Sequence, residues 1–346
     1  MKYKLIIKLL ITCLLITIIL LSVNIDEFIS VLKNTHLYLF LLASSLSVPG
    51  ILISTFKWKI LLDAHGIRHI PFPYLCGLYH IGMFFSNFLP TEVGGDIVRS
   101  YVVGKRSGKK TEAFAAVIME RLTGLIAIVL IAFIGCTLKF TLLNKLDLLQ
   151  PFVVIITASG LLLILFVNYR WIANALRRYF SINMLNVVSR KIDVLYDAIT
   201  FYKRKRPVLC VAVIISLIFQ MLTILYVYIL LASLGLSVSF LHLILIVPLI
   251  TILGLVPITI NSIGLREGAF IYLFFQFGLS TSESFALSIN YRLGILIFSL
   301  IGGLIYTFSE VKYDGLVEKL KSDGKVKNSK FKTRTLSKAV RRNHVE

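Results

Sequence analysis

The chain has 346 residues, of which 57% are hydrophobic and only 16% are charged, and its mean hydropathy is +0.86. Soluble domains contain about 25% charged residues, so this composition excludes an ordinary soluble enzyme and indicates a helical membrane protein. The formal net charge of +20 does not predict a nucleic-acid partner. The Lys and Arg residues instead cluster beside apolar runs, where anionic lipid headgroups attract them.

Eight apolar runs approach or exceed the roughly 20 residues that a helix needs to cross a bilayer. In chain order they occupy residues 5–23, 37–56, 74–103, 112–138, 150–168, 207–233, 241–278 and 284–308. Pro90 interrupts the third run, and Pro257 interrupts the seventh. The expected fold is therefore all-α, a multi-pass integral protein of the cell membrane.

The distribution of basic residues predicts the topology. Five segments hold 30 of the 37 Lys and Arg residues: 1–8, 57–72, 104–111, 170–206 and 311–346. The positive-inside rule places these segments in the cytoplasm, and both termini with them.

This topology makes the two interrupted runs hairpins. Residues 74–103 connect two cytoplasmic segments, so they must enter the membrane and return, and the same parity makes 241–278 a hairpin from the opposite side. Each hairpin is expected to break at its proline. Arms of about 15–18 residues come close to the ~30 Å hydrocarbon core, so re-entrant arms and full crossings both remain open.

The two hairpins also suggest an internal repeat. Arg99 lies nine residues after Pro90, and Arg266 lies nine residues after Pro257. Together with the opposed hairpins, this spacing predicts two inverted-topology repeats, at about 37–138 and 207–308. Such folds place the substrate site near the midplane, where the broken helices meet.

The predicted membrane domain covers residues 1–310 and includes an amphipathic cytoplasmic linker at 170–206. Residues 311–346 are polar and basic and are predicted to form a disordered cytoplasmic tail.

Charged residues inside the apolar runs are the main functional signal. A charge at the bilayer centre costs at least about 2.5–3.5 kcal/mol, so these side chains must be paired or must face a hydrated cavity. They are Glu92, Asp96, Arg99, Glu120, Arg121, Arg266, Glu267 and Arg292. One interpretation is that they form ion pairs that lock the bundle. The other is that the arginines bind an anion, most naturally a phosphate, whose oxygens match the guanidinium fork.

Small residues beside these charges favour the second interpretation. Gly94 and Gly95 are expected to expose backbone N–H groups at the start of a helix, which is a ready anion site. Asn261 and Gly264 offer a similar arrangement in the second hairpin. No metal or cofactor is expected.

Three motifs carry a resemblance to a known family: "NFLPTEVGGDIVRSYVVGKRSG" at 87–108, "MERLTG" at 119–124 and "PITINSIGLREGAF" at 257–270. They resemble the transmembrane flippase-like domain of bacterial lysylphosphatidylglycerol synthases (multipeptide resistance factors), over about residues 10–310. The resemblance implies a protein that moves a lipid between leaflets, with the motif residues lining the cavity.

The residues expected at the substrate or anion site are Asn87, Gly94, Gly95, Asp96, Arg99, Glu120, Arg121, Asn261, Gly264, Arg266, Glu267 and Arg292, with Pro90 and Pro257 as helix breaks. Asn87 is included because it matches the family's first motif.

The family's two-domain synthases also carry a soluble C-terminal domain that transfers lysine from tRNA. Only 36 residues follow Glu310, so the chain resembles a stand-alone member, and aminoacyl transfer is not expected.

The leading hypothesis is a translocator, not an enzyme, for a phosphate-bearing lipid such as a phospholipid or a polyprenyl-phosphate-linked intermediate. The expected partners are anionic membrane lipids. One alternative is a membrane glycosyltransferase that uses a polyprenyl-phosphate sugar, with Asp26 or Glu27 as its catalytic acid. Another is a non-catalytic subunit that docks a cytoplasmic glycosyltransferase or lipid-modifying enzyme through residues 170–206.

Overall fold

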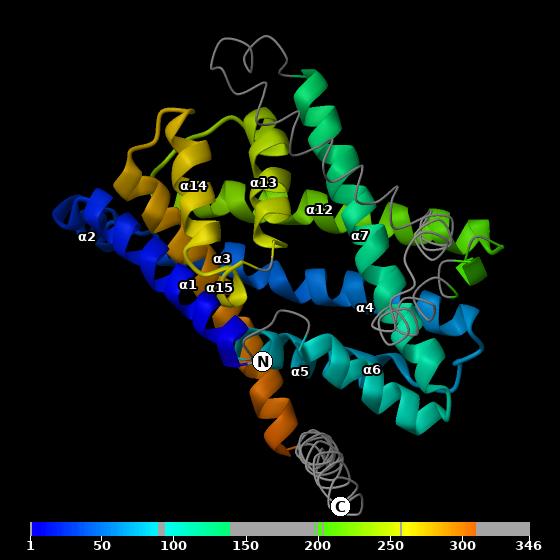
Figure 1. The fold of residues 1–346 in the computed structure, drawn as a ribbon. Coiled ribbons are helices and arrows are strands. Elements are labelled where there is room, and N and C mark those ends of the chain that lie inside the picture. Colours follow the sequence, from blue (N-terminus) through cyan, green and yellow to red (C-terminus); the bar gives the residue numbers. More distant parts are fainter. Residues whose placement is uncertain are drawn as a thin grey trace, which may run out of the picture. The chain divides into compact units, whose positions relative to one another are not determined.

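The computed structural model describes residues 2–88, 94–138, 197, 200–202, 204–256 and 258–308 (Figure 1). All regular elements in these ranges are helices, which confirms the all-α prediction. They are α1 (Lys2–Ser22), α2 (Ile25–Lys33), α3 (Leu37–Ser45), α4 (Ser47–Ala64), α5 (Phe72–Phe88), α6 (Gly94–Ser107), α7 (Lys110–Leu138), α12 (Arg206–Ser233), α13 (Phe240–Gly254), η1 (Ile260–Ser262), α14 (Leu265–Phe275) and α15 (Thr281–Phe308).

Several of these helices are long and apolar enough to cross a membrane. Four spans pass this test within the described part of the chain: α3 with α4, then α7, α12 and α15. The pair α1–α2, bent by 86°, makes a fifth if it is counted as one span. The chain is therefore a multi-pass membrane protein, and the predicted run at 150–168 lies outside the described residues.

The hairpin arms are shorter than a full crossing requires. The first hairpin consists of α5 with 17 residues and α6 with 14, and the second of α13 with 15 and α14 with 11. At 1.5 Å per residue, α14 is only about 17 Å long, against a core of ~30 Å. These lengths favour re-entrant hairpins. The predicted breaks at Pro90 and Pro257 lie outside the described residues.

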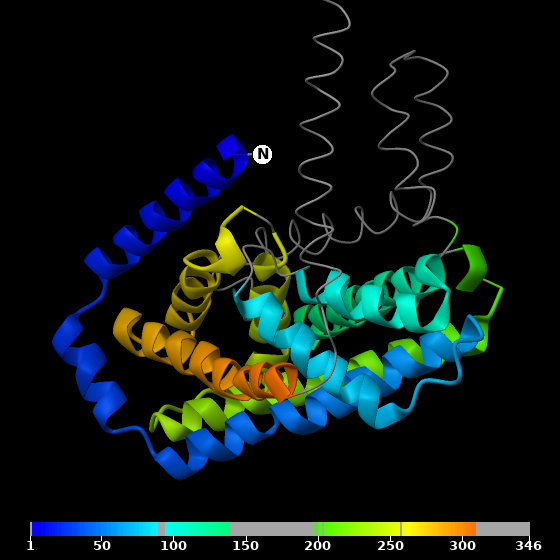
Figure 2. The ribbon, with the colours of Figure 1, turned by 90° about the horizontal axis from the view of Figure 1, so that it is seen from below.

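Helices α3 and α4 form one span that runs antiparallel to α12 (Figure 2). At one end the His36 N–H donates to the Ser233 carbonyl at 2.7 Å, and at the other Lys205 Nζ donates to the Ala64 carbonyl at 2.6 Å. The span is interrupted at Leu46, between α3 and α4, because Pro49 has no N–H to continue the helical hydrogen bonds.

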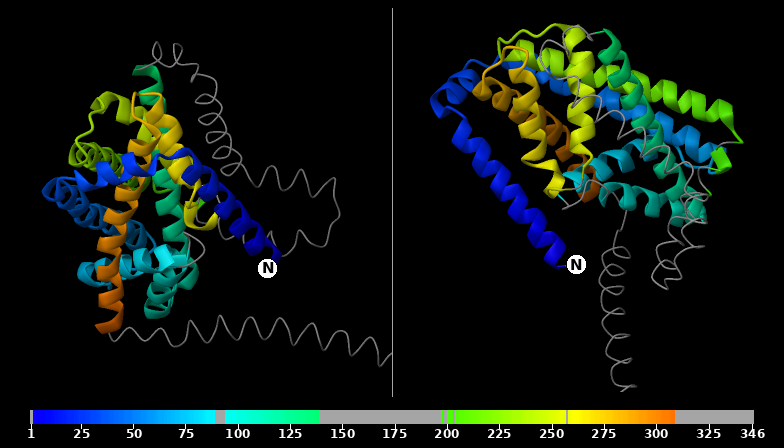
Figure 3. Two further views of the ribbon diagram at one scale, coloured as in Figure 1. Left: turned by 90° about the vertical axis from the view of Figure 1, so that its left-hand side faces the viewer. Right: turned by 45° about the horizontal axis from the view of Figure 1, so that its top comes forward.

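Helix α7 connects the two hairpins. It packs against α6 of the first hairpin and against α13 of the second. Gly135 lies directly against the backbone of Ile244 and Leu245, where a Cβ at Gly135 would come within 2.9 Å. Helix α1 lies on the outside of these helices, against α14 and η1 (Figure 3). The Ile260 N–H donates to Thr12 Oγ1 at this contact.

The second half repeats the first at a constant offset. Helices α6 and α14 begin at Gly94 and Leu265, and α7 and α15 begin at Lys110 and Thr281, so both pairs start 171 residues apart. The same offset matches the span α3–α4 with α12. Because these matched spans run antiparallel, the arrangement supports two repeats of opposite orientation.

This offset corrects the alignment made from the prolines, which are 167 residues apart. At an offset of 171, Asp96 corresponds to Glu267 and Arg121 to Arg292. Both acid–arginine pairs are in contact, and the partners are 25 residues apart in each. Arg99 therefore does not correspond to Arg266, as the prolines had suggested. The proline alignment failed because the loops between the hairpin arms differ in length.

Each half has its own apolar core. One is formed mainly by α4, α5 and α7, around the fully buried ring of Trp58. The other is formed mainly by α12, α13 and α14, around Phe270 and Phe274. The boundary between the halves is where polar side chains gather.

His65 follows the last residue of α4 and packs beneath the residues that lead into α12. Its ring stacks on Phe201 with centroids 3.9 Å apart and meets Tyr202 edge-on at 5.0 Å. The Nε2 atom of His65 is buried and accepts no hydrogen bond. Burial lowers the pKa of His65 to about 4, while nearby Glu112 opposes this shift and Lys109 and Lys205 add to it.

The structure predicts that Gly95→Ala is destabilising. A Cβ at Gly95 would overlap the Gly82 carbonyl oxygen, so α5 and α6 would have to separate. We expect a loss of about 1–3 kcal/mol or more in the free energy of unfolding in detergent. Gly268→Ala in α14 is the matched control, since nothing lies within 4 Å of its added Cβ. Equal stability of the two variants would contradict this packing.

The His65 pKa also predicts a pH dependence. The folded state binds its proton less readily than the unfolded state, so this contribution to stability is complete above about pH 6.5 and is lost as the pH falls toward 4. We expect the unfolding temperature of the wild type to fall over this window more steeply than that of His65→Phe, which keeps the ring stack. Parallel curves for the two proteins would show that His65 does not titrate in this way.

Candidate functional site

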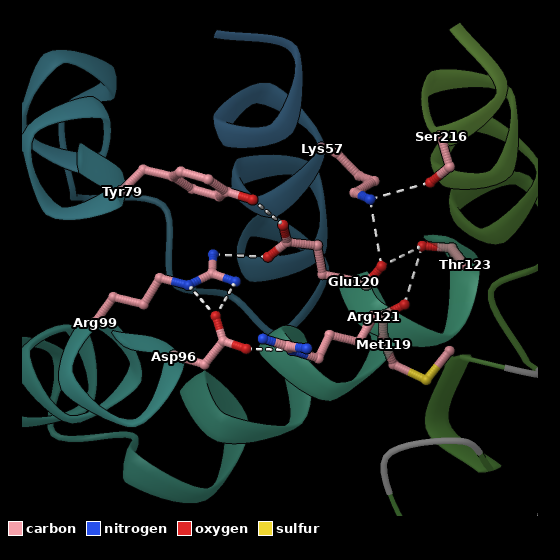
Figure 4. A network of polar contacts seen from close by, with 9 residues as sticks. All are labelled: Lys57, Tyr79, Asp96, Arg99, Met119, Glu120, Arg121, Thr123 and Ser216. Atoms are coloured by element: carbon pink, nitrogen blue, oxygen red, sulfur yellow. Dashed lines mark hydrogen bonds and ion pairs between the residues drawn. The ribbon is translucent and has the colours of Figure 1, made fainter. Parts of the chain in front are cut away.

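Asp96 joins two arginines from neighbouring helices (Figure 4). It lies in the first turn of α6, where a carboxylate is favoured by the helix dipole. Arg99, one turn later, donates to Asp96 Oδ1 from Nε at 3.0 Å and from Nη2 at 2.9 Å. Arg121 of α7 donates through Nε to Asp96 Oδ2. The carboxylate therefore ties α6 to α7.

Arg99 also binds a second carboxylate. Its Nη1 lies 2.7 Å from Glu120 Oε2, and the Tyr79 hydroxyl donates to Glu120 Oε1 at 2.9 Å. The guanidinium lies over the rings of Trp58 and Tyr79, 4.6 and 4.5 Å from their centroids. Only 4% of the Arg99 side chain is exposed. Arg99 thus acts first as a structural tie between α4, α5, α6 and α7.

Lys57 completes this network, and the sequence analysis placed it wrongly in a cytoplasmic segment. The apolar run was taken to end at residue 56, whereas α4 continues to Ala64, so Lys57 is buried within the span. Its Nζ donates to Ser216 Oγ of α12 at 3.0 Å and to the Glu120 carbonyl at 3.2 Å (Figure 4). The signal that identifies it is a lysine followed by further helix-forming apolar residues up to Leu62.

The second hairpin has a smaller ion-pair cluster. Arg292 of α15 donates to Glu267 Oε1 from Nη2 at 2.6 Å and from Nε at 2.9 Å. The other oxygen of Glu267 accepts the Gly264 N–H at 2.6 Å and so caps α14. Gly264 has φ +83°, which only glycine adopts readily. This cluster fixes the start of α14 against α15.

A cavity of about 350 Å³ lies between the two halves. Residues from both hairpins line it, together with residues from α3–α4, α7, α12 and α15. Of the residues predicted for the site, six line the cavity: Asn87, Asp96, Arg99, Arg121, Asn261 and Arg266. The other six do not line it: Gly94, Gly95, Glu120, Gly264, Glu267 and Arg292.

The walls of this cavity carry an excess of positive charge. Among its described lining residues are three guanidinium groups and one carboxylate, that of Asp96. The Arg121 side chain is 42% exposed, in contrast to Arg99. The Arg266 guanidinium lies 5.9 Å from the Tyr291 ring centroid, and Gly254 leaves room for it. Arg121 and Arg266 therefore approach the cavity from opposite hairpins, as an anion would require.

The predicted backbone cradle at Gly94 and Gly95 is not supported by the geometry. Both glycines are buried in the contact between α5 and α6, and Gly95 lies against the Gly82 carbonyl. Their role in this structure is close helix packing. Glu92, Pro90 and Pro257 lie outside the described residues. In the same described ranges, no three His, Cys, Asp or Glu side chains are placed to hold a metal ion.

The acids proposed for a glycosyltransferase lie away from the cavity lining. Asp26 and Glu27 form the first turn of α2, which the Asn24 side chain caps. Glu27 Oε1 accepts a hydrogen bond from Ser280 Oγ at 2.7 Å. These contacts connect α2 to the start of α15.

Comparison with known proteins identifies the family. A sequence model described as "Lysylphosphatidylglycerol synthase TM region" matches residues 5–303. The chain is 27% identical over 316 residues to a "UPF0104 membrane protein" of Methanothermobacter thermautotrophicus, covering 85% of this chain and 91% of the relative. A second protein of that name and organism is 23% identical over 301 residues, covering 81% and 85%. No solved structure matches the chain.

The ion-pair geometry predicts that Arg99→Gln is strongly destabilising. The variant leaves the buried Glu120 carboxylate without its cation, and breaking a buried pair costs about 3–5 kcal/mol. The double variant Arg99→Gln/Glu120→Gln should recover part of this loss, because no charge is then left unpaired. Unfolding in detergent measures both, with Arg106→Gln on the exposed end of α6 as control. A double variant less stable than Arg99→Gln would contradict the pairing.

Proposed function

The chain belongs to the family of the lysylphosphatidylglycerol synthase TM region, and from this premise we propose that it moves a phosphate-bearing lipid between leaflets. The lipid is a phospholipid or a polyprenyl-phosphate-linked intermediate. The single observation that carries the proposal is the cavity between the two halves, whose charged lining residues are three arginines and one aspartate. A phosphate there would balance the excess charge.

Arg121 and Arg266 are the residues that we expect to bind the phosphate. Arg99 is held by two carboxylates, whereas Arg121 shares one carboxylate with it and is partly exposed. Arg121 belongs to the first half and Arg266 to the second, and both line the cavity. The phosphate could then pass from one half to the other as the hairpins move, which is the alternating access expected of inverted repeats.

The proposed topology places both termini in the cytoplasm, with the first hairpin entering from that side and the second from the other. Anionic membrane lipids are both cargo and partners in this proposal. A cytoplasmic glycosyltransferase or lipid-modifying enzyme is a further proposed partner that would supply or use the lipid. The family match describes a membrane region, and no catalytic domain is evident in it.

The experiment is mass spectrometry of the lipids retained by the purified protein. We expect the wild type to be enriched in one phosphate-bearing lipid. Arg121→Gln and Arg266→Gln should each reduce it about tenfold or more, the effect of losing a charge-assisted hydrogen bond. Asp96 keeps its pair with Arg99 in the first variant, so folding is expected to be preserved. Arg106→Gln, outside the cavity, is the matched control and should retain the lipid.

Two results would contradict the proposal. Retained lipid that mirrors the bulk membrane in every sample would make the arginines structural and favour a docking subunit. Unchanged enrichment in both cavity variants would place the lipid elsewhere. Each variant's unfolding temperature must match that of the control for the comparison to be read.

A further inference from the structure

The cavity has two chemically different walls. The hairpins and α7 contribute the polar wall, with Ser86, Asn87, Asp96, Arg99, Arg121 and Arg266. The span α3–α4 and helix α12 contribute the other, with Leu46, Gly50, Ile51, Phe219 and Leu222. A ligand that satisfies both walls must carry an anionic group and an apolar group, which a free inorganic phosphate does not.

The apolar wall is a seam between two spans. On α4, small residues at helical spacing face the cavity: Ser47, Gly50 and Ser54. Across from Gly50 lie side chains of α12, because a Cβ at Gly50 would be 3.4 Å from Phe219 Cε2 and 3.6 Å from Leu222 Cδ2. Gly50 thus leaves about one methyl group of space, and larger side chains there would fill the seam.

The seam leads to the lipid side of the protein. Phe219 lines the cavity and is also 38% exposed. The residues around it on α12 are exposed and apolar: Ile214, Ile218, Met221 and Leu225. Helix α12 is also the most apolar of the candidate spans. An opening beside Phe219 therefore meets hydrocarbon, not water.

The cavity is too small to enclose a whole lipid. Its volume of about 350 Å³ equals that of roughly twelve water molecules, enough for a phosphate with a small headgroup but not for a long hydrocarbon chain as well. The chain of any bound lipid must therefore leave the cavity while the phosphate stays inside.

We infer that the seam between α4 at Gly50 and α12 at Phe219 is the lateral passage for the hydrocarbon chain. The ligand is a phosphate lipid that keeps its headgroup among the cavity arginines and its chain in the bilayer, with the Phe219 ring as the movable edge of the passage. This inference rests on the proposed function and adds the route and the amphipathic class of the substrate.

The first test fills the seam. Gly50→Leu should reduce the enriched lipid about tenfold, because its side chain occupies the path of the chain. Gly50→Ala should retain the lipid, since its Cβ fits at ordinary contact distance. The matched control is Leu52→Phe, which enlarges a lipid-exposed residue of the same helix. Full retention by a folded Gly50→Leu protein would overturn the seam and leave the proposed function standing.

The second test uses the wild type and so does not depend on a variant that folds. Phosphatidylglycerol and a polyprenyl phosphate, each with a photoreactive diazirine in its chain, are crosslinked to the protein and the labelled residues are mapped. Excess unlabelled lipid of the same kind should abolish labelling at Phe219 and Leu222 but not at Leu52, which touches bulk lipid. The probe that is competed identifies the source of the phosphate. If neither probe is competed at the seam, the inference is wrong.

If the wild type retains no phosphate lipid at all, the proposed function fails, and this inference fails with it. Loss in the arginine variants combined with retention in Gly50→Leu refutes the passage alone. The two failures are therefore distinguishable.

Discussion

The pairing of buried charges is the constraint on which the rest of this structure depends. An unpaired charge in the hydrocarbon core costs several kcal/mol, and Arg99, Asp96 and Glu120 are all nearly buried. They are stable there because one guanidinium serves two carboxylates and lies between two aromatic rings. This arrangement brings four helices to one point and fixes where the first hairpin ends. It also determines which arginines remain available to a ligand, since Arg99 is already engaged.

The second half solves the same packing problem without charge. At the repeat offset, Arg99 corresponds to Phe270 and Glu120 to Tyr291, and these two rings lie 5.4 Å apart. A buried ion pair in one half is thus matched by an aromatic pair in the other, while the outer pair, Asp96–Arg121 or Glu267–Arg292, is kept in both. The halves are alike in backbone and unlike in chemistry. The excess positive charge of the cavity follows from Arg266, whose position in the first half is occupied by Gly95.

Much of this architecture was readable from the sequence because membrane helices are marked by long apolar runs and by their basic flanks. The runs matched α1, α3–α4, α7, α12 and α15, and the two hairpins were expected because the charge parity required them. The polar residues were harder to place. Lys57 was assigned to a loop, since a charge at the end of an apolar run looks the same whether the helix stops or continues. The glycines at 94 and 95 suggested an anion cradle, but close helix packing uses the same residues, and only the Gly82 carbonyl beside Gly95 distinguishes the two.

The register of the repeat could not be read from the prolines because loops accept insertions that packed helices do not. The constant offset is held instead by contacts that span 25 residues, from a carboxylate in a short helix to an arginine in the next long one. Moving either partner by one position would turn it to another face of its helix and leave a charge in lipid. The ion pairs that stabilise the fold therefore also preserve the symmetry of the two halves. A cavity at their boundary is the place where residues freed from this duty, Arg266 above all, can take up a role in binding.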